Sequence, residues 1–459
     1  MSIFNNIKTG AMNELVMYMS KSDQNRDKVI NLLKFFTKSS EKKETLAKLK
    51  DDTIFMPVLS RFGQLNPQVR KKLIENLVVA YLIQGTERRK AYEEKYGIRP
   101  PAMILISPSM RCNLKCVGCY AGEYEQDEGL PYPTVKRILN EVKTMGINFV
   151  TISGGEPFAW PYLFKMFEDF PDIYFQVYTN GTLITENVAK RIAKLGNIAP
   201  AISVEGFENE TARRRGHGVY LKVMNAMHYL RKYGCIFGFS ATPTRLNADL
   251  LATDEFIKYY AKIGCMFGWF FNYVPIGLAP DVNLMPTPEQ RTKLRKKVHA
   301  WRADKNVKMF LGDFWNDGPF VKGCIAGAPQ DKFFNAGYLH INHHGDLEPC
   351  GFVHFAVDNI KNKSLREGLN NKFFKALEEE KKKTIKNYLM PCCIIDHPTV
   401  LRNAVKKSGA YPTHKGADSI IKDKKIMKFL DNYSKKMMKI SKKDWNEKYR
   451  FMCNGEPVK

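Results

Sequence analysis

Short apolar segments alternate with helix-like segments six times between residues 100 and 305. The apolar segments lie at 103–107, 149–153, 174–178, 199–204, 236–242 and 267–273. Between and after them, residues 134–145, 162–170, 186–195, 220–233, 249–263 and 287–301 repeat apolar residues at helical spacing. This alternation predicts a parallel sheet with crossover helices, and the uninterrupted apolar strands indicate burial on both faces of that sheet.

The six units span about 200 residues, which is short of the eight units and ~250 residues of a closed barrel. We therefore predict an α/β fold built on a partial (β/α)6 barrel at residues 100–305. Residues 1–99 are predicted to be an N-terminal helical region, with one helix that begins at Asn66-Pro67 and ends at Gly85. Residues 306–400, rich in Gly, Asn, His and Cys, form a small module, and residues 401–459 form a basic helical tail.

Composition indicates where such a chain works. No apolar run approaches the ~20 residues that span a bilayer, and the opening MSIFNNIKTG lacks the charged leader and apolar block of a secretion signal. We therefore expect a cytoplasmic protein, with a peripheral position at the membrane as an alternative. Ten cysteines in that compartment indicate metal ligands or buried thiols rather than disulfides.

The net charge of +25 favours acidic partners: nucleic acid, an anionic membrane or an acidic electron carrier. A lysine-rich surface without any partner is the plain alternative. In the tail, one predicted helix surrounds an apolar stripe with lysines; the stripe is Ile426, Leu430, Tyr433, Met437 and Ile440. That stripe either lies on an anionic membrane or packs on the barrel, and we favour packing. The tail contains no recognisable nucleic-acid-binding module, so no nucleic-acid partner is expected.

Three cysteines, Cys112, Cys116 and Cys119, follow the first predicted strand within eight residues. Ligands of parallel sheets bind at the carboxyl ends of the strands, which is where this loop is predicted to lie. A structural zinc site takes four ligands, usually as two pairs. A cubane cluster has four irons that each take one thiolate, so three cysteines leave one iron open for a substrate or cofactor. Zinc with a distant fourth ligand is the alternative.

The cysteine loop, together with Gly154-Gly155-Glu156-Pro157 after the second strand, resembles the radical S-adenosylmethionine (SAM) superfamily. The resemblance covers residues 100–305 and implies a 4Fe–4S cluster on the three cysteines, with SAM chelated at the open iron. It implies that an electron, supplied by reduced flavodoxin or ferredoxin, cleaves the sulfonium. The 5′-deoxyadenosyl radical that results then abstracts a hydrogen atom from the substrate.

Polar residues at the predicted strand ends are candidates for binding SAM. The two glycines let the backbone approach a ligand, the proline fixes the loop exit, and Glu156 or nearby carbonyls offer an acceptor for the ligand ammonium. The polar residues at the end of the fourth strand resemble the family's ribose-contacting position. Those at the ends of the fifth and sixth strands could equally be polar groups that hydrogen-bond within the protein and contact no ligand. The candidate SAM-binding residues are Gly154, Gly155, Glu156, Pro157, Ser203, Glu205, Ser240 and Asn272.

Two further features bear on SAM. Arg213, Arg214 and Arg215 offer a guanidinium for its carboxylate, although at least two of them are expected to be a solvated charge run. The family often carries an aromatic residue just before the third cysteine, near the adenine. Here that position is Gly118, with Tyr120 on the other side of the cysteine, so the adenine contact stays unassigned.

A second set of cysteines lies in the predicted module: Cys324, Cys350, Cys392 and Cys393. A short hairpin, 338–342 with 347–350, would bring two of their segments together. The set resembles the SPASM or twitch module of many radical SAM enzymes and implies one auxiliary 4Fe–4S cluster. Adjacent cysteines are awkward ligands for one cluster, so His397 or a substrate atom is the alternative to Cys393. A zinc site or free thiols are the alternatives to a cluster. The remaining cysteines are expected to be core thiols, Cys235 and Cys265, and an unliganded Cys453.

No catalytic residue is identified, but Asp313 and Asp317, with Trp315 between them, are candidates for lining the substrate cavity. A capped helix start is the alternative at this place. Our leading hypothesis is a radical SAM enzyme that abstracts a hydrogen atom from an unactivated C–H, with a membrane lipid as one candidate substrate. The first alternative is modification of a peptide or protein side chain, and the second is a non-catalytic iron–sulfur scaffold or redox sensor.

Overall fold

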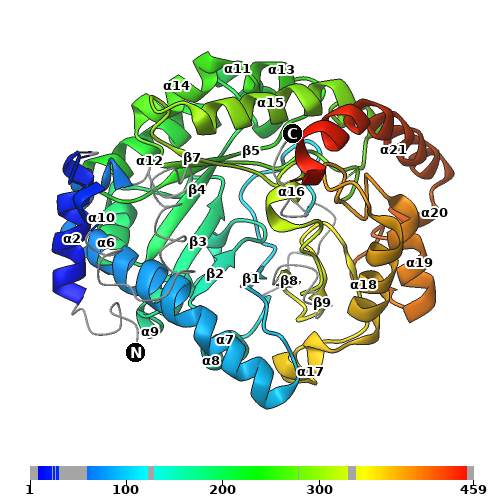
Figure 1. The fold of residues 1–459 in the computed structure, drawn as a ribbon, viewed down its shortest axis with the longest axis horizontal. Helices are drawn as coiled ribbons and strands as arrows, with labels where there is room; N and C mark the ends of the chain where they lie inside the picture. Colours follow the sequence, from blue (N-terminus) through cyan, green and yellow to red (C-terminus); the bar gives the residue numbers. More distant parts are fainter. Residues whose placement is uncertain are drawn as a thin grey trace.

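The computed structural model describes residues 9–22, 24–25, 27–29, 31, 59–121, 129–277, 279–328 and 337–451. Its strands run through the middle of the molecule and its helices surround them (Figure 1). The strands are β1 (Met103–Ile106), β2 (Phe149–Ile152), β3 (Tyr174–Thr179), β4 (Ile198–Val204), β5 (Gly238–Ala241), β6 (Phe267–Phe270), β7 (Phe310–Asp313), β8 (Tyr338–Ile341), β9 (Leu347–Glu348), β10 (Phe355–Ala356) and β11 (Tyr411–Pro412).

The helices fall into three groups along the chain. Before β1 come α2 (Thr9–Lys21), η2 (Phe62–Gln64), α6 (Pro67–Lys72), η3 (Leu73–Gln84) and α7 (Gly85–Tyr96). Among the strands β1 to β7 come α8 (Tyr132–Thr144), η4 (Pro157–Ala159), α9 (Leu163–Asp169), α10 (Glu186–Leu195), α11 (Glu208–Arg215), α12 (Val219–Lys232), α13 (Ala248–Leu251), α14 (Asp254–Ile263), η5 (Val282–Leu284) and α15 (Pro288–Ala303). After β7 come α16 (Gly318–Val321), α17 (Leu365–Leu369), α18 (Lys372–Thr384), α19 (Pro398–Ser408), α20 (Ser419–Lys422), α21 (Lys424–Asp444) and η6 (Trp445–Tyr449).

The six predicted strands pair in parallel in one sheet, which confirms the α/β fold class. The sheet is larger than predicted, with nine strands in the order β7-β6-β5-β4-β3-β2-β1-β8-β9. β7 extends the sheet beyond β6, and β8 pairs in parallel with β1 at the opposite side. The predicted hairpin forms between β8 and β9. The prediction missed that this hairpin joins the main sheet, because pairing across 230 residues of chain leaves no local pattern.

The two faces of the sheet are covered by different helices. Phe175, Val177 and Ile202 face the main core, which includes apolar residues of α8 to α15. Tyr174 and Ala201, on the opposite face, pack in a second cluster with residues of α2, η2, α6 and η3. The N-terminal helices therefore cover one face of the sheet, and the crossover helices cover the other.

The predicted helix start at Asn66-Pro67 is confirmed, since the Asn66 side chain accepts a hydrogen bond from Gln68 N at 2.9 Å. The predicted stop at Gly85 is wrong. Gly85 keeps right-handed helical angles, and the helix runs on to Gly97, whose φ is 65°. A Cβ on Gly85 would lie 2.9 Å from Gly146 O, so this glycine allows close packing instead of ending the helix.

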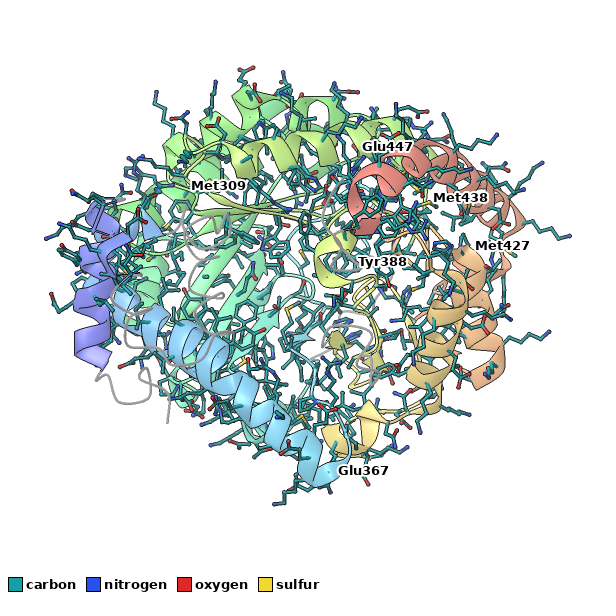
Figure 2. All side chains as sticks on the ribbon, viewed as in Figure 1. Met309, Glu367, Tyr388, Met427, Met438 and Glu447 are labelled. Carbon is teal, nitrogen blue, oxygen red and sulfur yellow. The ribbon has the colours of Figure 1, made fainter. Side chains whose placement is uncertain are left out.

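The tail stripe packs on the protein, as favoured from the sequence. Ile426, Leu430, Tyr433 and Met437 of α21 are buried in the main core, and α21 contacts α15 and α19. The half-exposed Met438, labelled in Figure 2, lies on the outer side of α21 among exposed lysines. The apolar face of this helix is therefore already occupied. Within the part of the chain that the structure describes, no helix is both long and apolar enough to cross a membrane.

Candidate active site

A cavity of about 230 Å³ lies at the carboxyl ends of β1 to β6. The three loop cysteines, Cys112, Cys116 and Cys119, all line this cavity, which we call the first cavity. Of the predicted SAM-binding residues, those that line it are Gly154, Gly155, Ser203, Ser240 and Asn272. The structure thus brings together residues that lie more than 150 positions apart in the sequence, at the edge of the sheet where ligands were expected.

The three thiols sit among N–H donors. Cys112 Sγ accepts hydrogen bonds from Leu114 N at 3.5 Å and Asn180 Nδ2 at 3.9 Å, and Cys116 Sγ accepts one from Arg215 Nη1 at 3.8 Å. Burial raises the pKa of Cys112 to about 11, and it also raises the pKa of Cys119. Bound iron would remove the thiol protons, and N–H groups aimed at sulfur are a known means of tuning iron–sulfur clusters.

The three thiols of the loop are not gathered around one point. Across the described ranges, no group of three His, Cys, Asp or Glu side chains converges closely enough to hold one metal ion. A zinc ion needs its ligand atoms about 2.0–2.3 Å away on all sides. A cubane cluster takes one thiolate for each iron, so the three thiols that line the cavity would leave one iron open.

Gly154 and Gly155 allow two loops to touch. A Cβ on Gly154 would lie 2.2 Å from Ser109 O, and a Cβ on Gly155 would lie 2.3 Å from Arg111 O. The gap is closed by hydrogen bonds from Gly155 N to Ser109 O at 3.1 Å and from Glu156 N to Arg111 O at 2.8 Å. These glycines therefore allow close approach to the backbone of the cysteine loop as well as to the cavity.

Glu156 and Pro157 do not line the first cavity. The Glu156 carboxylate is buried and accepts hydrogen bonds from Thr179 Oγ1 at 2.6 Å, Asn180 N at 2.7 Å and Phe158 N at 3.1 Å. With three donors it is already satisfied, so it holds the end of β3 instead of offering an acceptor to a ligand ammonium. Pro157 begins η4 behind it.

Glu205 is likewise turned away from the first cavity. Its buried carboxylate pairs with Arg214 Nη1 at 2.5 Å and with Arg215 Nη2 at 2.6 Å. Arg214 and Arg215 line the cavity, whereas Arg213 is exposed to solvent outside it. The expectation that at least two of the three arginines are solvated is therefore wrong, because Glu205 draws two of them inward.

Asn272 and Tyr273, after β6, are the clearest ligand-facing residues. Asn272 is 2% exposed, and both polar atoms of its amide lack a hydrogen-bond partner. Such an orphaned pair in a cavity wall indicates a bound polar ligand. The Tyr273 ring packs on Gly118, where a Cβ would lie 2.6 Å from Tyr273 Cε2. Sequence reasoning missed Tyr273, although the absent side chain at position 118 was a signal that another ring fills this space.

The four other cysteines line a second cavity of about 560 Å³: Cys324, Cys350, Cys392 and Cys393. Tyr338 Oη donates to Cys350 Sγ at 2.7 Å, and Ile394 N donates to Cys392 Sγ at 3.3 Å. A hydrogen bond from the Cys393 thiol lowers the pKa of Cys324. His397 is buried but does not line this cavity, so Cys393 and not His397 completes the set. Cys235 and Cys265 are buried in the core as expected, and Cys453 lies outside the described residues.

Aromatic side chains separate the two cavities. The residues that line both are Met103, Trp269, Phe314, Tyr338 and Phe352. The Tyr120 ring, next to Cys119, lies 5.6 Å from the Phe352 ring, two residues from Cys350. In the wall of the first cavity, the charged side chains are those of Arg214 and Arg215. The space between the two thiol sets is thus apolar and suited to neutral groups.

Asp313 and Asp317 do not line the first cavity. Asp317 is held by Arg302 at 2.8 and 2.6 Å in the wall of the second cavity, with Trp315 nearby. Asp313 is buried, lines neither cavity, and accepts a hydrogen bond from Asn316 at 2.7 Å. Burial raises the pKa of Asp313 to about 6. Asp317 does precede the short helix α16, but its side chain makes no capping hydrogen bond there, so the alternative of a capped helix start is not confirmed either.

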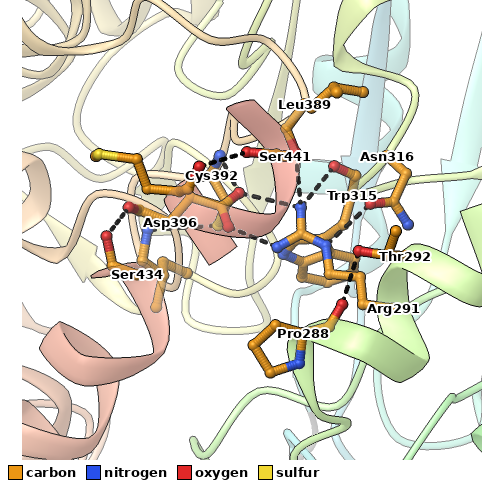
Figure 3. A network of polar contacts seen from close by, with 12 residues as sticks. Pro288, Arg291, Thr292, Trp315, Asn316, Leu389, Cys392, Asp396, Ser434 and Ser441 are labelled. Atoms are coloured by element: carbon orange, nitrogen blue, oxygen red, sulfur yellow. Dashed lines mark hydrogen bonds and ion pairs between the residues drawn. The ribbon is translucent and has the colours of Figure 1, made fainter. Parts of the chain in front are cut away.

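A buried arginine ties the barrel to the second cavity (Figure 3). Arg291 of α15 donates to Asp396 Oδ1 at 2.5 Å and Oδ2 at 3.2 Å, and to Asn316 Oδ1 at 2.9 Å. The Asp396 carboxylate in turn accepts from Cys392 N at 3.0 Å. Arg291 thereby fixes the loop that carries Cys392 and Cys393. Its role could not be seen in the sequence, because it stands in a helix with five other basic side chains.

Comparison with known proteins agrees with this geometry. Residues 106–257 match the family model described as Radical SAM superfamily. The mycofactocin maturase of Mycobacterium tuberculosis is 28% identical over an alignment of 278 residues that covers 58% of this chain and 68% of that protein. The AdoMet-dependent heme synthase of Nitratidesulfovibrio vulgaris is 24% identical over 296 residues, covering 57% of this chain and 76% of that protein.

Among solved structures, Streptococcus suis SuiB bound to S-adenosylmethionine superposes with a TM-score of 0.55 at 19% identity. The superposition covers 67% of this chain and 76% of SuiB, so it shows the same fold. Enzymes of the superfamily require a reductant such as flavodoxin or ferredoxin. With the motif pair, the three-thiol cavity and the matched family model in agreement, the chain belongs to the radical SAM superfamily and is an enzyme that uses a 4Fe–4S cluster and SAM.

Proposed function

We propose that this enzyme modifies a side chain of a peptide or protein by abstracting a hydrogen atom from an unactivated C–H. The observation that carries the proposal is the similarity to a mycofactocin maturase over 58% of the chain, combined with a second cavity lined by four cysteines. The leading hypothesis from the sequence, hydrogen abstraction by a radical SAM enzyme, is kept, and its candidate lipid substrate is replaced by the alternative, a peptide or protein side chain. Four of the five residues of the tail stripe are buried in the core and Ile440 is half-buried, so this face of the tail helix is not free to lie on a membrane.

Each part of the first cavity has a role in this proposal. Cys112, Cys116 and Cys119 hold the 4Fe–4S cluster, and Asn272, with Ser203 and Ser240, contacts SAM. When bound, the cluster supplies the electron that cleaves SAM to the radical that abstracts the hydrogen atom. Arg214 and Arg215, held by Glu205, present fixed guanidinium groups to the SAM carboxylate. The aromatic side chains between the cavities would keep water away from the reacting groups.

For the second cavity, we propose one auxiliary 4Fe–4S cluster on Cys324, Cys350, Cys392 and Cys393. These four thiols suffice for the four irons of one cubane. The Tyr338 hydroxyl and the Ile394 N–H, both directed at sulfur, would stabilise the thiolate form. This second group would lie across the aromatic wall from the substrate, beside Phe352.

The similarity to a heme synthase raises a tetrapyrrole as a second substrate class, but the cavity walls do not favour one. Tetrapyrrole carboxylates need cations of their own. Of the guanidinium groups in the two walls, those of Arg214 and Arg215 are assigned here to SAM, and that of Arg302 pairs with Asp317, so none is left for a second set of carboxylates. A neutral side chain of a peptide fits the uncharged space between the cavities better.

Deuterium transfer tests the substrate class. Anaerobically reconstituted enzyme would be reduced with dithionite and incubated with SAM and either the peptide fraction or the lipid fraction of cells grown on deuterated medium. We expect 5′-deoxyadenosine to acquire deuterium from the peptide fraction and not from the lipid fraction, as measured by mass spectrometry. Enrichment from the lipid fraction alone would overturn the proposal, and so would enrichment only from an added deuterated tetrapyrrole.

A further inference from the structure

Two polar side chains lie in the wall of the first cavity, deeper than the strand ends. Thr151 of β2 and Gln176 of β3 both line this cavity and are only 3% and 6% exposed. They stand opposite each other in the pairing of β2 with β3, which lie side by side in the sheet (Figure 1). Since paired strands are about 4.8 Å apart, the two residues form one polar place, which we call the Thr151–Gln176 site.

The side chains of this site point into the cavity. Ile152 and Val177, the next residues along β2 and β3, are buried in the main core on the other face of the sheet. Because successive side chains of a strand point to opposite faces, Thr151 and Gln176 face the cavity. Within the part of the chain that the structure describes, no protein group hydrogen-bonds with the Thr151 hydroxyl or the Gln176 carboxamide. Polar groups enclosed in this way indicate a bound polar ligand.

The strands on either side of the site contribute apolar side chains. Leu105 of β1 is paired with Thr151, and Ala199 of β4 is paired with Gln176. The guanidinium groups in the cavity wall belong to α11 and are held by Glu205, which follows the end of β4. The Thr151–Gln176 site therefore offers hydrogen bonds without charge, in surroundings that exclude water.

The site lies between the residues assigned to SAM and the second set of cysteines. Ser203, which is assigned to SAM, stands four residues nearer the carboxyl end of β4 than Ala199, the partner of Gln176. At about 3.3 Å per residue, the site is roughly 13 Å deeper along the strands. On the other side, a Cβ on Gly351, the residue after Cys350, would lie 3.0 Å from Leu105 Cδ2. A substrate held between SAM and the second set therefore passes this site.

Hydrogen-bonding capacity decides which substrate group suits the site. The Gln176 carboxamide and the Thr151 hydroxyl can each donate and accept. A carboxylate only accepts and an ammonium only donates, and either would bring a charge without a partner into apolar surroundings. A hydrocarbon group would leave both residues without hydrogen bonds. An amide is neutral and donates and accepts at two separate atoms, which suits two partners on neighbouring strands.

We propose that Thr151 and Gln176 bind an amide group of the substrate and so determine which part of a peptide is presented for hydrogen abstraction. The inference rests on the proposed peptide substrate and names the group by which that substrate is recognised. The amide comes either from the side chain of an asparagine or glutamine or from the peptide backbone. The first source would make the enzyme selective for one residue type, and the second would favour peptides in general.

Small probes test the site without any radical chemistry. Propionamide represents a side-chain carboxamide, N-methylacetamide represents a backbone peptide group, and methyl propionate has a similar shape without N–H. Each is titrated into reconstituted enzyme in the absence of SAM, and binding is measured by ligand-observed NMR. We expect at least one amide to bind about tenfold or more tightly than the ester, and the tighter amide identifies the source. Equal binding of both amides and the ester would overturn the proposal.

Two variants locate the preference for an amide. Gln176→Met and Thr151→Val keep the side-chain volume nearly unchanged and remove hydrogen-bonding groups, so each should reduce the tenfold preference to about twofold or less. The matched control is Thr211→Val. Thr211 is buried, its hydroxyl has no hydrogen-bond partner within the described residues, and it lines neither cavity. The control should keep the full preference. An unchanged preference in both test variants would contradict the assignment.

Deuterium transfer separates this proposal from the proposed function. With SAM and the peptide fraction of deuterated cells, both test variants should transfer deuterium to 5′-deoxyadenosine at least about tenfold more slowly than the wild type. Their SAM affinity, measured by equilibrium dialysis, should stay within about twofold, which also shows that they are folded. If the wild type acquires no deuterium from peptides, the proposed function fails, and the probe titration still decides whether the amide site exists. If both variants transfer deuterium at the wild-type rate, only the amide proposal fails.

Discussion

The two cysteine cavities are assembled in opposite ways. The first cavity takes its three thiols from one loop of eight residues, directly after β1. The second takes four thiols from three segments spread over 70 residues, and a buried Arg291–Asp396 ion pair holds one of these segments. The first set is therefore defined by local sequence, while the second exists only when distant parts of the chain are packed together. Because the two sets of thiols are held by different parts of the chain, we expect a substitution at one site to lower iron binding there and to leave the other site intact.

The largest effect is expected from Cys116→Ala. Removing one of three thiols from a loop with no substitute ligand should abolish 5′-deoxyadenosine formation and lower the iron content from about eight to about four atoms per chain. The measurements are iron analysis and product assay after anaerobic reconstitution. Cys235→Ala, at a core thiol outside both cavities, is the control and should keep its iron. If the iron content of Cys116→Ala equalled that of the wild type, the three loop cysteines would not be the ligands of a separate cluster, and the comparison of the two sites would fail.

Next in size is Arg291→Met, which should damage the second site and spare the first. It leaves the fully buried Asp396 carboxylate without its partner, at a cost of about 3–5 kcal/mol in the free energy of unfolding. Urea unfolding measures that cost, and spectroscopy of each cluster shows which site loses iron. The double variant R291M/D396L removes both charges and should regain much of the stability. If Arg291→Met lost iron from both sites, the two sites would not be independent of each other.

A smaller effect, confined to the first site, is expected from Gly155→Ala. The new Cβ would lie 2.3 Å from Arg111 O, a backbone atom, so the cysteine loop and the Gly-Gly-Glu-Pro loop must move apart. We expect weaker SAM binding and a loss of about 1–3 kcal/mol of stability, measured by equilibrium dialysis and thermal unfolding. Gly63→Ala, where a Cβ would meet no atom within 4 Å, is the matched control. Unchanged SAM affinity in Gly155→Ala would show that the contact between the loops is dispensable.

The smallest effect concerns pH at the second cavity, which His299 lines. Burial lowers the pKa of His299 to about 4, whereas an unfolded histidine titrates near 6.5. Between these values the unfolded chain binds more protons, so the free energy of unfolding should fall as pH drops from 6.5 towards 4 and be level above 6.5. At pH 5 the loss should be on the order of 1–2 kcal/mol. His299→Gln should remove this slope in thermal unfolding of metal-free protein; an identical slope in the variant would exclude His299 as its source.

Sequence patterns over a few neighbouring residues predicted the parts of the structure that depend on contacts between neighbouring residues. Neighbouring residues in the sequence were enough to predict the six strands of the barrel, the cap at Asn66, the cysteine loop and the Gly-Gly-Glu-Pro loop. The structure has all of them in the predicted places. Ser203, Ser240 and Asn272 reach the first cavity because parallel strands end at the same edge of the sheet.

The features that were predicted wrongly or missed depend on contacts between residues that are far apart in the sequence. Glu156 and Glu205 were predicted to face SAM. In the structure, Glu156 instead accepts hydrogen bonds from the end of β3, and Glu205 forms ion pairs with two arginines of α11. No sequence pattern shows that Arg291 faces Asp396, or that Cys393 and not His397 reaches the second cavity. The edge strand β7 and the pairing of β8 with β1 were missed for the same reason, since both depend on a neighbouring strand that is distant in the sequence.

β8 lies beside β1 in parallel register, with Ile341 opposite Ile106, and each strand leads towards one set of thiols. Adjacent strands keep a spacing of about 4.8 Å that no hinge motion alters. The hydrogen-bonded pairing of β1 and β8 therefore fixes the separation of the chain segments from which the two sets of thiols extend. On this basis we expect the size of the reacting group to decide which side chains fit between the two sets.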